Sequence, residues 1–370
     1  MSEQRHSSPG TAWAAVRSQT RQLRTELQVL AALVALCGYF IATQGSTFAS
    51  SSNFDNMVWQ GSILFVVAAG QMFALIVGGF DLSVAANMGF ASTVSALVMQ
   101  GGGSPATAIL VGVASGAAVG AVNGFVIAYL KISPFVATLG MLTFLSGFAN
   151  RLAHGQSVSG LHPDFISWLG SSGGSLRLPS AAFVAIGVLV VSWFVASRHR
   201  IGLYIYAVGG SDAASRLAGV RVASIVVLAY TLCGTLASLA GLLLSARVGI
   251  GQAALGQTFD LLSIAAAVIG GVAIGGGVGR LSGVILGVAL FTVLTTGLNI
   301  AAVDEFTQQM ITGAVLVLAV LLAQLQGAPK FSVRSLLGRA TRAPDAPAPG
   351  HPAESTAAVS VTTSMRGDDE

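Results

Sequence analysis

The side chains that could do chemistry in this chain are scattered singly along it. His154, His162 and His199 lack the spacing of metal ligands. A glycine-rich run, Gly275–Gly279, is followed by Arg280 and not by the Lys and Ser or Thr of a phosphate-binding P-loop. No nucleophile stands with a base and an orienting partner. The sequence therefore predicts no metal site, no catalytic residues and no ATP binding by a P-loop in this chain.

A few polar residues stand inside or beside long apolar runs, and each has two interpretations. Asp81 either caps a helix that begins at Leu82 or lies in a broken helix that lines a polar pathway, where a carboxylate is costly. Asp260 either caps a helix from outside or faces an entrance. Asn123 and Asn299 lie near the ends of apolar helices, where they either hydrogen-bond between helices or contact a polar ligand.

The spacing of the charges predicts the elements that must position these residues. Only 9% of residues are charged, 54% are hydrophobic, and the mean hydropathy is +0.78. Soluble domains carry about 25% charged residues. Between Glu26 and Lys330 the charges are separated by apolar runs, and a helix needs about 20 apolar residues to cross a bilayer. These runs predict an all-α, polytopic membrane protein.

The run from Asp81 to Lys131 is long enough for two crossings, separated by Gly101-Gly102-Gly103-Ser104-Pro105. The sequence thus predicts ten transmembrane helices. The expected spans are 27–43, 58–79, 84–100, 106–130, 135–150, 180–197, 222–246, 259–278, 282–300 and 307–325.

The basic residues predict the orientation of these spans. With both termini in the cytoplasm, three basic residues lie outside: Arg151, Arg177 and Arg247. Thirteen lie inside: Arg17, Arg21, Arg24, Lys131, Arg198, Arg200, Arg216, Arg221, Arg280, Lys330, Arg334, Arg339 and Arg342. Such a bias is the positive-inside rule. It also explains the net charge of +4 without invoking nucleic acid.

The predicted domain organisation has three parts. Residues 1–26 form a polar, basic cytoplasmic tail, and residues 27–327 form the transmembrane domain. Residues 328–370 are rich in Pro, Ala, Ser and Thr, a composition that cannot bury a core and predicts a disordered cytoplasmic tail.

The polar stretch at 151–179 is expected on the outside. Within it, Pro163 and Asp164 open a short helix with Phe165, Ile166, Trp168 and Leu169 as an apolar face at the membrane interface. This stretch is either an anchored loop or a docking surface for an external partner. The docking candidates are His162, Asp164, Phe165 and Trp168.

The polar stretch at 198–221 is the longest cytoplasmic loop in this topology. Gly209 and Gly210 break the chain, Ser211 is an N-cap, and Asp212 lies in a first turn where the helix dipole favours an anion. A short helix continues through Ala213, Ala214, Ser215, Arg216 and Leu217, and Gly219 ends it. It is either an ordinary loop helix or a docking element for another protein.

Four fragments in series resemble the permeases of ribose/xylose/arabinose-type ABC sugar importers, over roughly residues 55–325. They are GGFDLSV at 78–84, Asn123-Gly124 followed by ISPFVATLG at 132–140, GLYIYAVGGSDAASRLAGV at 202–220, and DLLSIAAAVIGG at 260–271 with the glycines up to Gly283. The chain departs from the family pattern at two places, each by a conservative change. Family members often have Asn-Glu where this chain has Ser211-Asp212, and many have Glu near Asp260.

The resemblance implies a type II importer fold that works as a dimer in the inner membrane. It implies a separate ATPase subunit that binds ATP and Mg²⁺, an extracytoplasmic sugar-binding protein and a second permease subunit. The helix at 211–219 would couple to the ATPase. Asp81, Asn123, Thr138, Asp260 and Asn299 are the pathway candidates. Alternatives are import of a nucleoside, an amino acid or a sugar-like signal such as autoinducer-2, an ion-coupled secondary transporter, and a membrane-bound enzyme.

Overall fold

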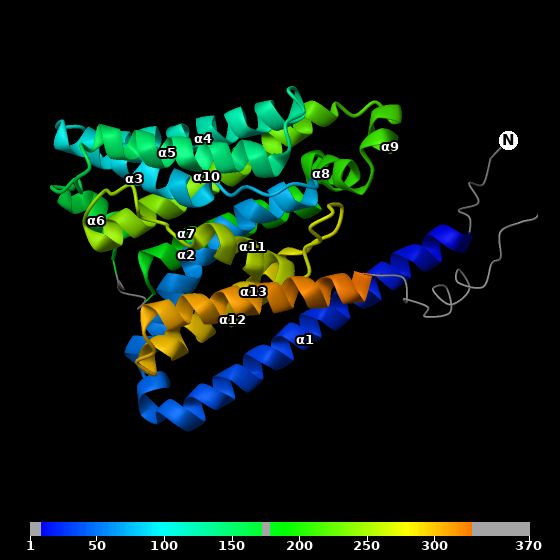
Figure 1. The fold of residues 1–370 in the computed structure, drawn as a ribbon, viewed down its shortest axis with the longest axis horizontal. Coiled ribbons are helices and arrows are strands. Elements are labelled where there is room, and N and C mark those ends of the chain that lie inside the picture. The colour runs from blue at the N-terminus through cyan, green and yellow to red at the C-terminus, as the bar shows by residue number, and fades with distance from the viewer. Residues whose placement is uncertain (1–8, 172–177, 328–370) are drawn as a thin grey trace, which may run out of the picture. The chain divides into compact units, whose positions relative to one another are not determined.

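The computed structural model describes residues 9–171 and 178–327, and its regular elements there are all helices (Figure 1). The long helices are α1 (Pro9–Phe48), α2 (Ser51–Ile76), α3 (Val84–Gln100), α4 (Pro105–Ala128), α5 (Pro134–Leu152), α7 (Ser180–Ser197), α10 (Val222–Val248), α12 (Leu281–Ile300) and α13 (Glu305–Gly327). The short helices are α6 (Pro163–Leu169), α8 (Arg200–Gly210), α9 (Asp212–Leu217) and α11 (Phe259–Ile269).

Local sequence signals account for several helix ends. The Ser50 hydroxyl accepts from the Asn53 N–H at 3.2 Å and caps α2. Ser104 caps α4 in the same way, with Pro105 at the first helical position, where its missing N–H costs nothing. At the end of α10, Gly249 has φ of 78°, a left-handed conformation that favours glycine.

The all-helical membrane fold is confirmed, but the expected count of ten spans is not. Seven helices in the described part of the chain are long and apolar enough to cross a membrane: α1, α2, α4, α5, α7, α10 and α12. α3 and α11 are apolar but shorter. The expected span at 259–278 is wrong in length, because α11 ends at Ile269 and Gly271 follows with φ of 89°.

The first helix begins before the predicted start of the transmembrane domain at residue 27, and that boundary itself stays a prediction. α1 begins at Pro9, so helix extends through much of the polar segment that was expected to be a tail. The predicted tail at 328–370 lies outside the described residues.

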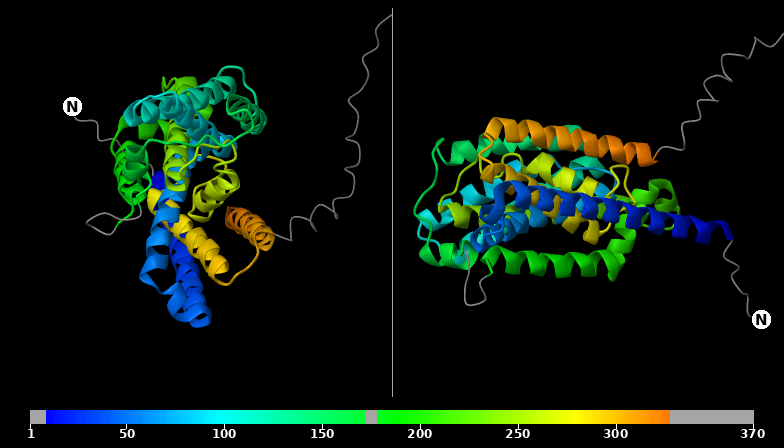
Figure 2. Two further views of the ribbon diagram at one scale, coloured as in Figure 1. Left: turned by 90° about the vertical axis from the view of Figure 1, so that its left-hand side faces the viewer. Right: turned by 90° about the horizontal axis from the view of Figure 1, so that it is seen from below.

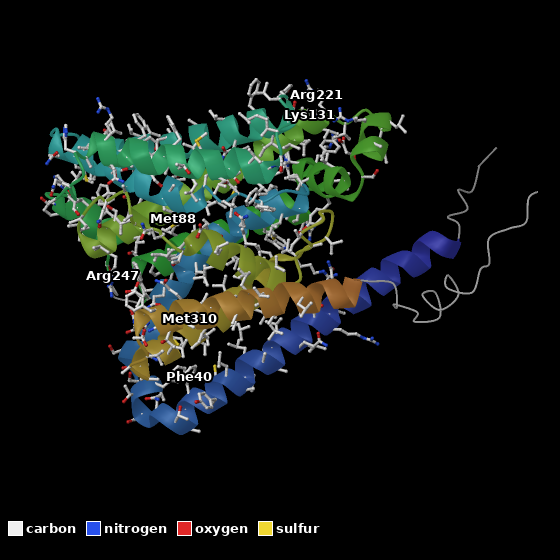
Figure 3. The ribbon with its side chains drawn as sticks, viewed as in Figure 1. Phe40, Met88, Lys131, Arg221, Arg247 and Met310 are labelled. Carbon is white, nitrogen blue, oxygen red and sulfur yellow. The ribbon has the colours of Figure 1, made fainter. Side chains whose placement is uncertain are left out.

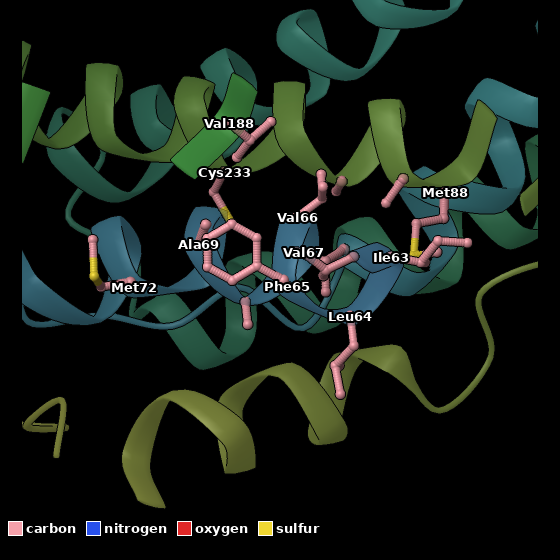
Figure 4. Packing of buried hydrophobic residues seen from close by; sticks show 14 of the residues in the cluster. Ile63, Leu64, Phe65, Val66, Val67, Ala69, Met72, Met88, Val188 and Cys233 are labelled. Atoms are coloured by element: carbon pink, nitrogen blue, oxygen red, sulfur yellow. The ribbon is translucent and has the colours of Figure 1, made fainter. Parts of the chain in front are cut away.

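α2 lies at the centre of the packing. Its side chains from Ser62 to Ile76 are buried, and α10, α11, α12 and α7 all pack against it. Figure 4 shows α2 side chains in one cluster with Met88 of α3, Val188 of α7 and Cys233 of α10. By contrast, α4, α5 and α7 expose large apolar side chains such as Leu110, Phe144 and Val191, as expected where helices face lipid or another subunit.

Glycines allow a close helix crossing between α4 and α10. A Cβ on Gly234 would collide with the Gly116 carbonyl, and one on Gly120 would collide with the Tyr230 carbonyl. Small residues of this kind let membrane helices approach closely. α1 lies on the other side of the bundle from α4 and α5 (Figures 1 and 2), packed on α12.

Candidate functional site

The first candidate site is the interruption between α2 and α3, which contains Asp81. α3 begins at Val84 with Ser83 as its N-cap residue, so the expectation that Asp81 caps a helix beginning at Leu82 is wrong. Asp81 instead closes a local turn: its Oδ1 accepts from the Ser83 N–H at 2.8 Å and from the Ser83 hydroxyl at 2.6 Å. Its side chain is buried, with 1% relative exposure.

The interruption lies inside the helix bundle. The Tyr230 hydroxyl, two turns into α10, donates to the Phe80 carbonyl at 3.2 Å. A Cβ on Gly79 would collide with the same hydroxyl, so a side chain at this position would have to displace Tyr230. Irregular backbone at membrane depth persists only where protein or a water-lined cavity satisfies it. The broken-helix interpretation of Asp81 therefore agrees with the geometry.

A polar cluster surrounds Asp81. The Asn123 amide of α4 donates to the Ser83 hydroxyl at 2.8 Å and lies 3.5 Å from each carboxylate oxygen of Asp81. The Gln71 amide of α2 faces the Asp81 backbone. In the orientation that satisfies both groups, its oxygen accepts from the Asp81 N–H at 2.9 Å and its nitrogen donates to the Asp81 carbonyl at 3.2 Å.

These contacts hold a carboxylate with neutral hydrogen-bond donors alone. No ion pair involves Asp81 in residues 9–171 and 178–327. A buried charge without a cation is costly unless hydrogen bonds compensate it. The cluster can therefore accept hydrogen bonds from a hydroxylated ligand, or it can fix the helix interruption in place. The geometry suits both roles and brings together Asp81 and Asn123, two of the pathway candidates.

Asn87 belongs to the same polar layer but was not predicted from the sequence. It lies on α3, one turn after Ser83, and its side chain is 1% exposed. Its amide nitrogen donates to the Gly234 carbonyl of α10 at 3.0 Å and to the Gly116 carbonyl of α4 at 3.3 Å. Its Oδ1 has no hydrogen-bond partner among the described residues. The spacing Ser83–Asn87 within an apolar run is the signal that would have identified it.

The other pathway candidates have different surroundings. Thr138 is buried, and its hydroxyl donates to the Pro134 carbonyl within α5 at 2.8 Å. Asp260 is half-buried in the first turn of α11, whose N-cap position is Thr258. Asn299 is exposed and accepts from Gln308 at 2.9 Å, which links α12 to α13. The structure therefore does not bring Asn299 into the buried cluster.

The loop before Asp260 folds back along α3. The Gln252 N–H donates to the Ser92 hydroxyl at 3.2 Å, and that hydroxyl lies 3.1 Å from the Gln252 carbonyl. A Cβ on Gly89 would collide with the Ala253 carbonyl. The loop therefore packs on α3, and Asp260 lies in the first turn of a short helix and not of a full-length span.

The second candidate site is the helix pair α8–α9. Ser211 caps α9 as predicted, since its hydroxyl accepts from the Ala214 N–H at 3.2 Å. Gly219, with φ of 80°, follows the end of α9. Gly209 and Gly210 form the last residues of α8, so the break falls directly after them.

Most of α9 is exposed. Ala213, Ala214 and Ala218 are all exposed, and Leu217 is 91% exposed. Arg216 pairs with Asp212 through two bonds of 2.8 and 3.2 Å, one helical turn apart. The exception is Ser215, which is buried. Leu217 is thus a large apolar side chain that the described part of the chain leaves almost uncovered.

α8 connects this exposed helix to the interruption after α2. Gly209 lies so close to the Ile76 carbonyl that any Cβ would collide with it, and the same carbonyl accepts from the Gly277 N–H at 2.8 Å. The Tyr206 hydroxyl donates to the Gly279 carbonyl at 2.8 Å. α8, the end of α2 and the glycine loop between α11 and α12 are thus in direct contact, through one backbone bond, the Tyr206 hydroxyl and the close approach at Gly209.

The predicted docking helix is present as α6, capped by His162, whose ring nitrogen accepts from the Asp164 N–H at 3.2 Å. Its apolar residues divide between two faces. Phe165 and Leu169 are buried, whereas Trp168 is 53% exposed. Because Phe165 is fully covered, it cannot contact an external partner in this conformation. His162, Asp164 and Trp168 remain accessible candidates.

Broken helices, a buried polar cluster and an exposed helix tied to them are features of a helical membrane transport protein. Residues 53–320 match the family described as branched-chain amino acid transport system / permease component. The chain belongs to this family. It is a permease subunit and not an enzyme, and it is a multi-pass protein of the inner membrane.

Relatives from several bacteria cover most of the chain. The ribose import permease protein RbsC of Escherichia coli (strain K12) is 33% identical over 305 residues, which cover 82% of this chain and 94% of that protein. The galactose/methyl galactoside import permease protein MglC of Haemophilus influenzae is 35% identical over 318 residues, covering 80% and 94%. The D-allose transport system permease protein AlsC of Escherichia coli (strain K12) is 31% identical over 298 residues, covering 80% and 90%. No solved structure matches this chain.

Proposed function

We propose that this chain is the membrane subunit of an ATP-driven importer for a monosaccharide that a binding protein delivers. One observation carries this proposal: relatives named as ribose, galactose and allose permeases align over 80% or more of the chain. The buried cluster around Asp81, rich in amide and hydroxyl groups, suits a hydroxylated substrate.

In the proposed importer, a separate subunit binds ATP and Mg²⁺, and it contacts this chain through α9. Support comes from the exposure of Leu217 and of the small residues around it. At the centre of a protein–protein interface, a side chain of one protein usually inserts into a pocket on the other. The contacts of Gly209 and Tyr206 would carry a displacement of α9 to the end of α2 and the glycine loop.

The proposed orientation places α8–α9 and both termini in the cytoplasm. Figure 3 shows Lys131 and Arg221 at the end of the bundle that holds α8 and α9, and Arg247 at the other end, near α6. This distribution follows the positive-inside rule. α6 would then face the binding protein, and the apolar faces of α4, α5 and α7 would face lipid and a second permease subunit. We propose no nucleic-acid partner for this chain.

Uptake by the complete importer tests the substrate class. Vesicles that contain this chain, its ATPase and its binding protein should accumulate D-ribose, D-galactose or D-allose when ATP is supplied, and not L-leucine. Uptake of L-leucine alone would overturn the sugar assignment while leaving the permease assignment intact. Uptake that continues without ATP and follows an ion gradient would contradict the ATP-driven mechanism.

A further inference from the structure

Residues 250–258, which we call the connecting segment, join α10 to α11 without forming a helix and run along one face of α3. A Cβ on Gly251 would collide with the Ala96 methyl group, and one on Gly256 would lie 2.9 Å from the Ala85 carbonyl. The contacts between these two points, described above, follow α3 in steps of three or four residues, which lie on one helix face. The segment therefore runs antiparallel to α3, from near its end to its start.

These contacts carry the connecting segment from the outer end of the bundle toward its middle. At the outer end, Gly251 exchanges two backbone hydrogen bonds of 2.8 Å with Val158, which precedes α6. The stretch of α3 from Ala96 to Ala85 is roughly 16 Å long at 1.5 Å per residue, about half of the ~30 Å hydrocarbon thickness of a bilayer. Figure 3 shows Met88, which also contacts Gly256, between the two ends of the bundle.

At this depth the connecting segment presents polar side chains that the described part of the chain leaves open. Gln257 and Thr258 are exposed, and neither side chain hydrogen-bonds to the residues that the structure describes. Non-helical backbone at membrane depth is tolerated where protein buries it or where it lines a water-filled cavity, but not against lipid. The exposed end of the segment therefore borders water or another subunit.

The chemistry of these two residues suits a sugar. The Gln257 amide and the Thr258 hydroxyl each donate and accept hydrogen bonds, as sugar hydroxyls do. Thr258 also has φ of 78°, a left-handed conformation that is uncommon for a β-branched residue. Strained backbone of this kind gathers at ligand-binding and other functional sites.

We infer that the connecting segment is a wall of the sugar pathway, and that the Gln257 amide and the Thr258 hydroxyl contact the sugar as it passes. The inference rests on the proposed function, which supplies the sugar and the outward direction of α6. Asp81 is buried in this conformation, so these two side chains, and not Asp81, are open to a sugar.

The reactivity of single cysteines distinguishes water from lipid or protein at the connecting segment. Gln257→Cys and Thr258→Cys are each made in a chain with Cys37 and Cys233 replaced by Ala. The complete importer is placed in lipid nanodiscs, which leave both faces open, and treated with a charged thiol reagent. Thiols react as thiolates, and apolar surroundings suppress the thiolate. Each cysteine should react at least about tenfold faster than Val190→Cys.

Val190→Cys is the matched control. Val190 is 56% exposed on α7, whose open apolar side chains are expected to face lipid or a second subunit. If Gln257→Cys and Thr258→Cys both react as slowly as Val190→Cys, lipid or protein covers the segment, and the inference is overturned.

Uptake tests the contact with the sugar. Thr258→Val keeps the β-branched shape and removes the hydroxyl, and Gln257→Leu removes the amide. With saturating loaded binding protein, each should lower the maximal rate of sugar uptake roughly two- to tenfold, the effect of one lost hydrogen bond. The ATPase should stay bound and continue to hydrolyse ATP. Thr258→Ser restores a hydroxyl and should recover most of the uptake lost in Thr258→Val.

The outcomes separate this inference from the proposed function. If the complete importer accumulates a sugar while the two cysteines stay unreactive, or while Thr258→Val and Gln257→Leu transport it at the wild-type rate, the inference is overturned and the function stands. If L-leucine is imported in place of the sugars, the proposed function and the sugar contact are both overturned.

Discussion

Among the candidate residues, Asp81 is a carboxylate in a buried position, where a charge is costly. Its carboxylate is buried, it is bonded by Ser83 and lies beside Asn123, and no cation pairs with it in the described part of the chain. The sequence singled out Asp81 and Asn123 because polar residues in apolar runs are costly. It did not identify Gln71 or Asn87, because their roles depend on which helices the fold brings beside them.

The structure changes the expected effect of Asp81→Asn. A helix cap would tolerate Asn, since Asn and Asp cap equally well. In the buried cluster, Asn would present an amide donor toward the Asn123 amide. Hydrogen bonds to a charged group contribute roughly 1.5–3 kcal/mol, so uptake should fall by at least about tenfold. Uptake in vesicles measures this, with gel filtration to confirm assembly.

Asp304→Asn is the matched control for this prediction. Asp304 is exposed, and its Oδ1 accepts from the Thr307 N–H at 3.0 Å at the start of α13, a bond that Asn can replace. Uptake should remain near the wild-type level. If Asp81→Asn also transports normally, the cluster has only a structural role.

At the scale of helices, most element positions followed from local signals. Charges marked the ends of apolar runs, and Ser104-Pro105 and Ser211 marked helix starts that the structure confirms. The short α11 was not predicted, because glycine is common within membrane helices and Gly270-Gly271 gave no clear stop. The packing of α8 against Ile76 depends on tertiary contacts that the local sequence does not encode.

The link between α8 and the glycine loop leads to a prediction for Tyr206. Burial raises the pKa of its phenol, which the charge of Arg280 partly opposes, so the hydroxyl stays protonated and donates to Gly279. Tyr206→Phe should leave the ATPase bound to the permease, because α9 is untouched. Sugar uptake per ATP hydrolysed should fall, because one connection between α8 and the loop is lost.

Tyr204→Phe is the control, since Tyr204 lies on the same helix with 38% exposure. Co-purification, ATP hydrolysis and uptake are measured for both variants. Equal ratios of uptake to hydrolysis in the two variants would show that the Tyr206 bond does not transmit the signal.

At the scale of the whole molecule, the orientation rests on the basic residues and is open to direct test. Single cysteines at Ser159 and Ser171, in a protein with Cys37 and Cys233 replaced by Ala, should react with a membrane-impermeant thiol reagent in intact cells. A cysteine at Ser211 should react only after the membrane is opened. Ser159 and Ser211 are both exposed, so accessibility alone does not distinguish them. Labelling of Ser211 in intact cells would reverse the orientation and remove the basis for coupling through α9.

The central claim is that ATP hydrolysis in a separate subunit drives sugar uptake through α9. Ala214 is exposed on α9, and a bulky charge there should block docking, whereas Ala214→Ser should not. Arg216→Glu should act in the same way by reversing a charge. Asp212→Asn breaks the same ion pair, which contributes only about 0.3–0.5 kcal/mol, and serves as its control.

The decisive measurement is the co-purification of the ATPase together with ATP-driven uptake of D-ribose, D-galactose or D-allose in vesicles. Ala214→Glu and Arg216→Glu should insert and fold normally, yet lose the ATPase or hydrolyse ATP without uptake. Ala214→Ser and Asp212→Asn should resemble the wild type. Full complex and full uptake in both Ala214→Glu and Arg216→Glu would contradict the claim that α9 couples the permease to its ATPase.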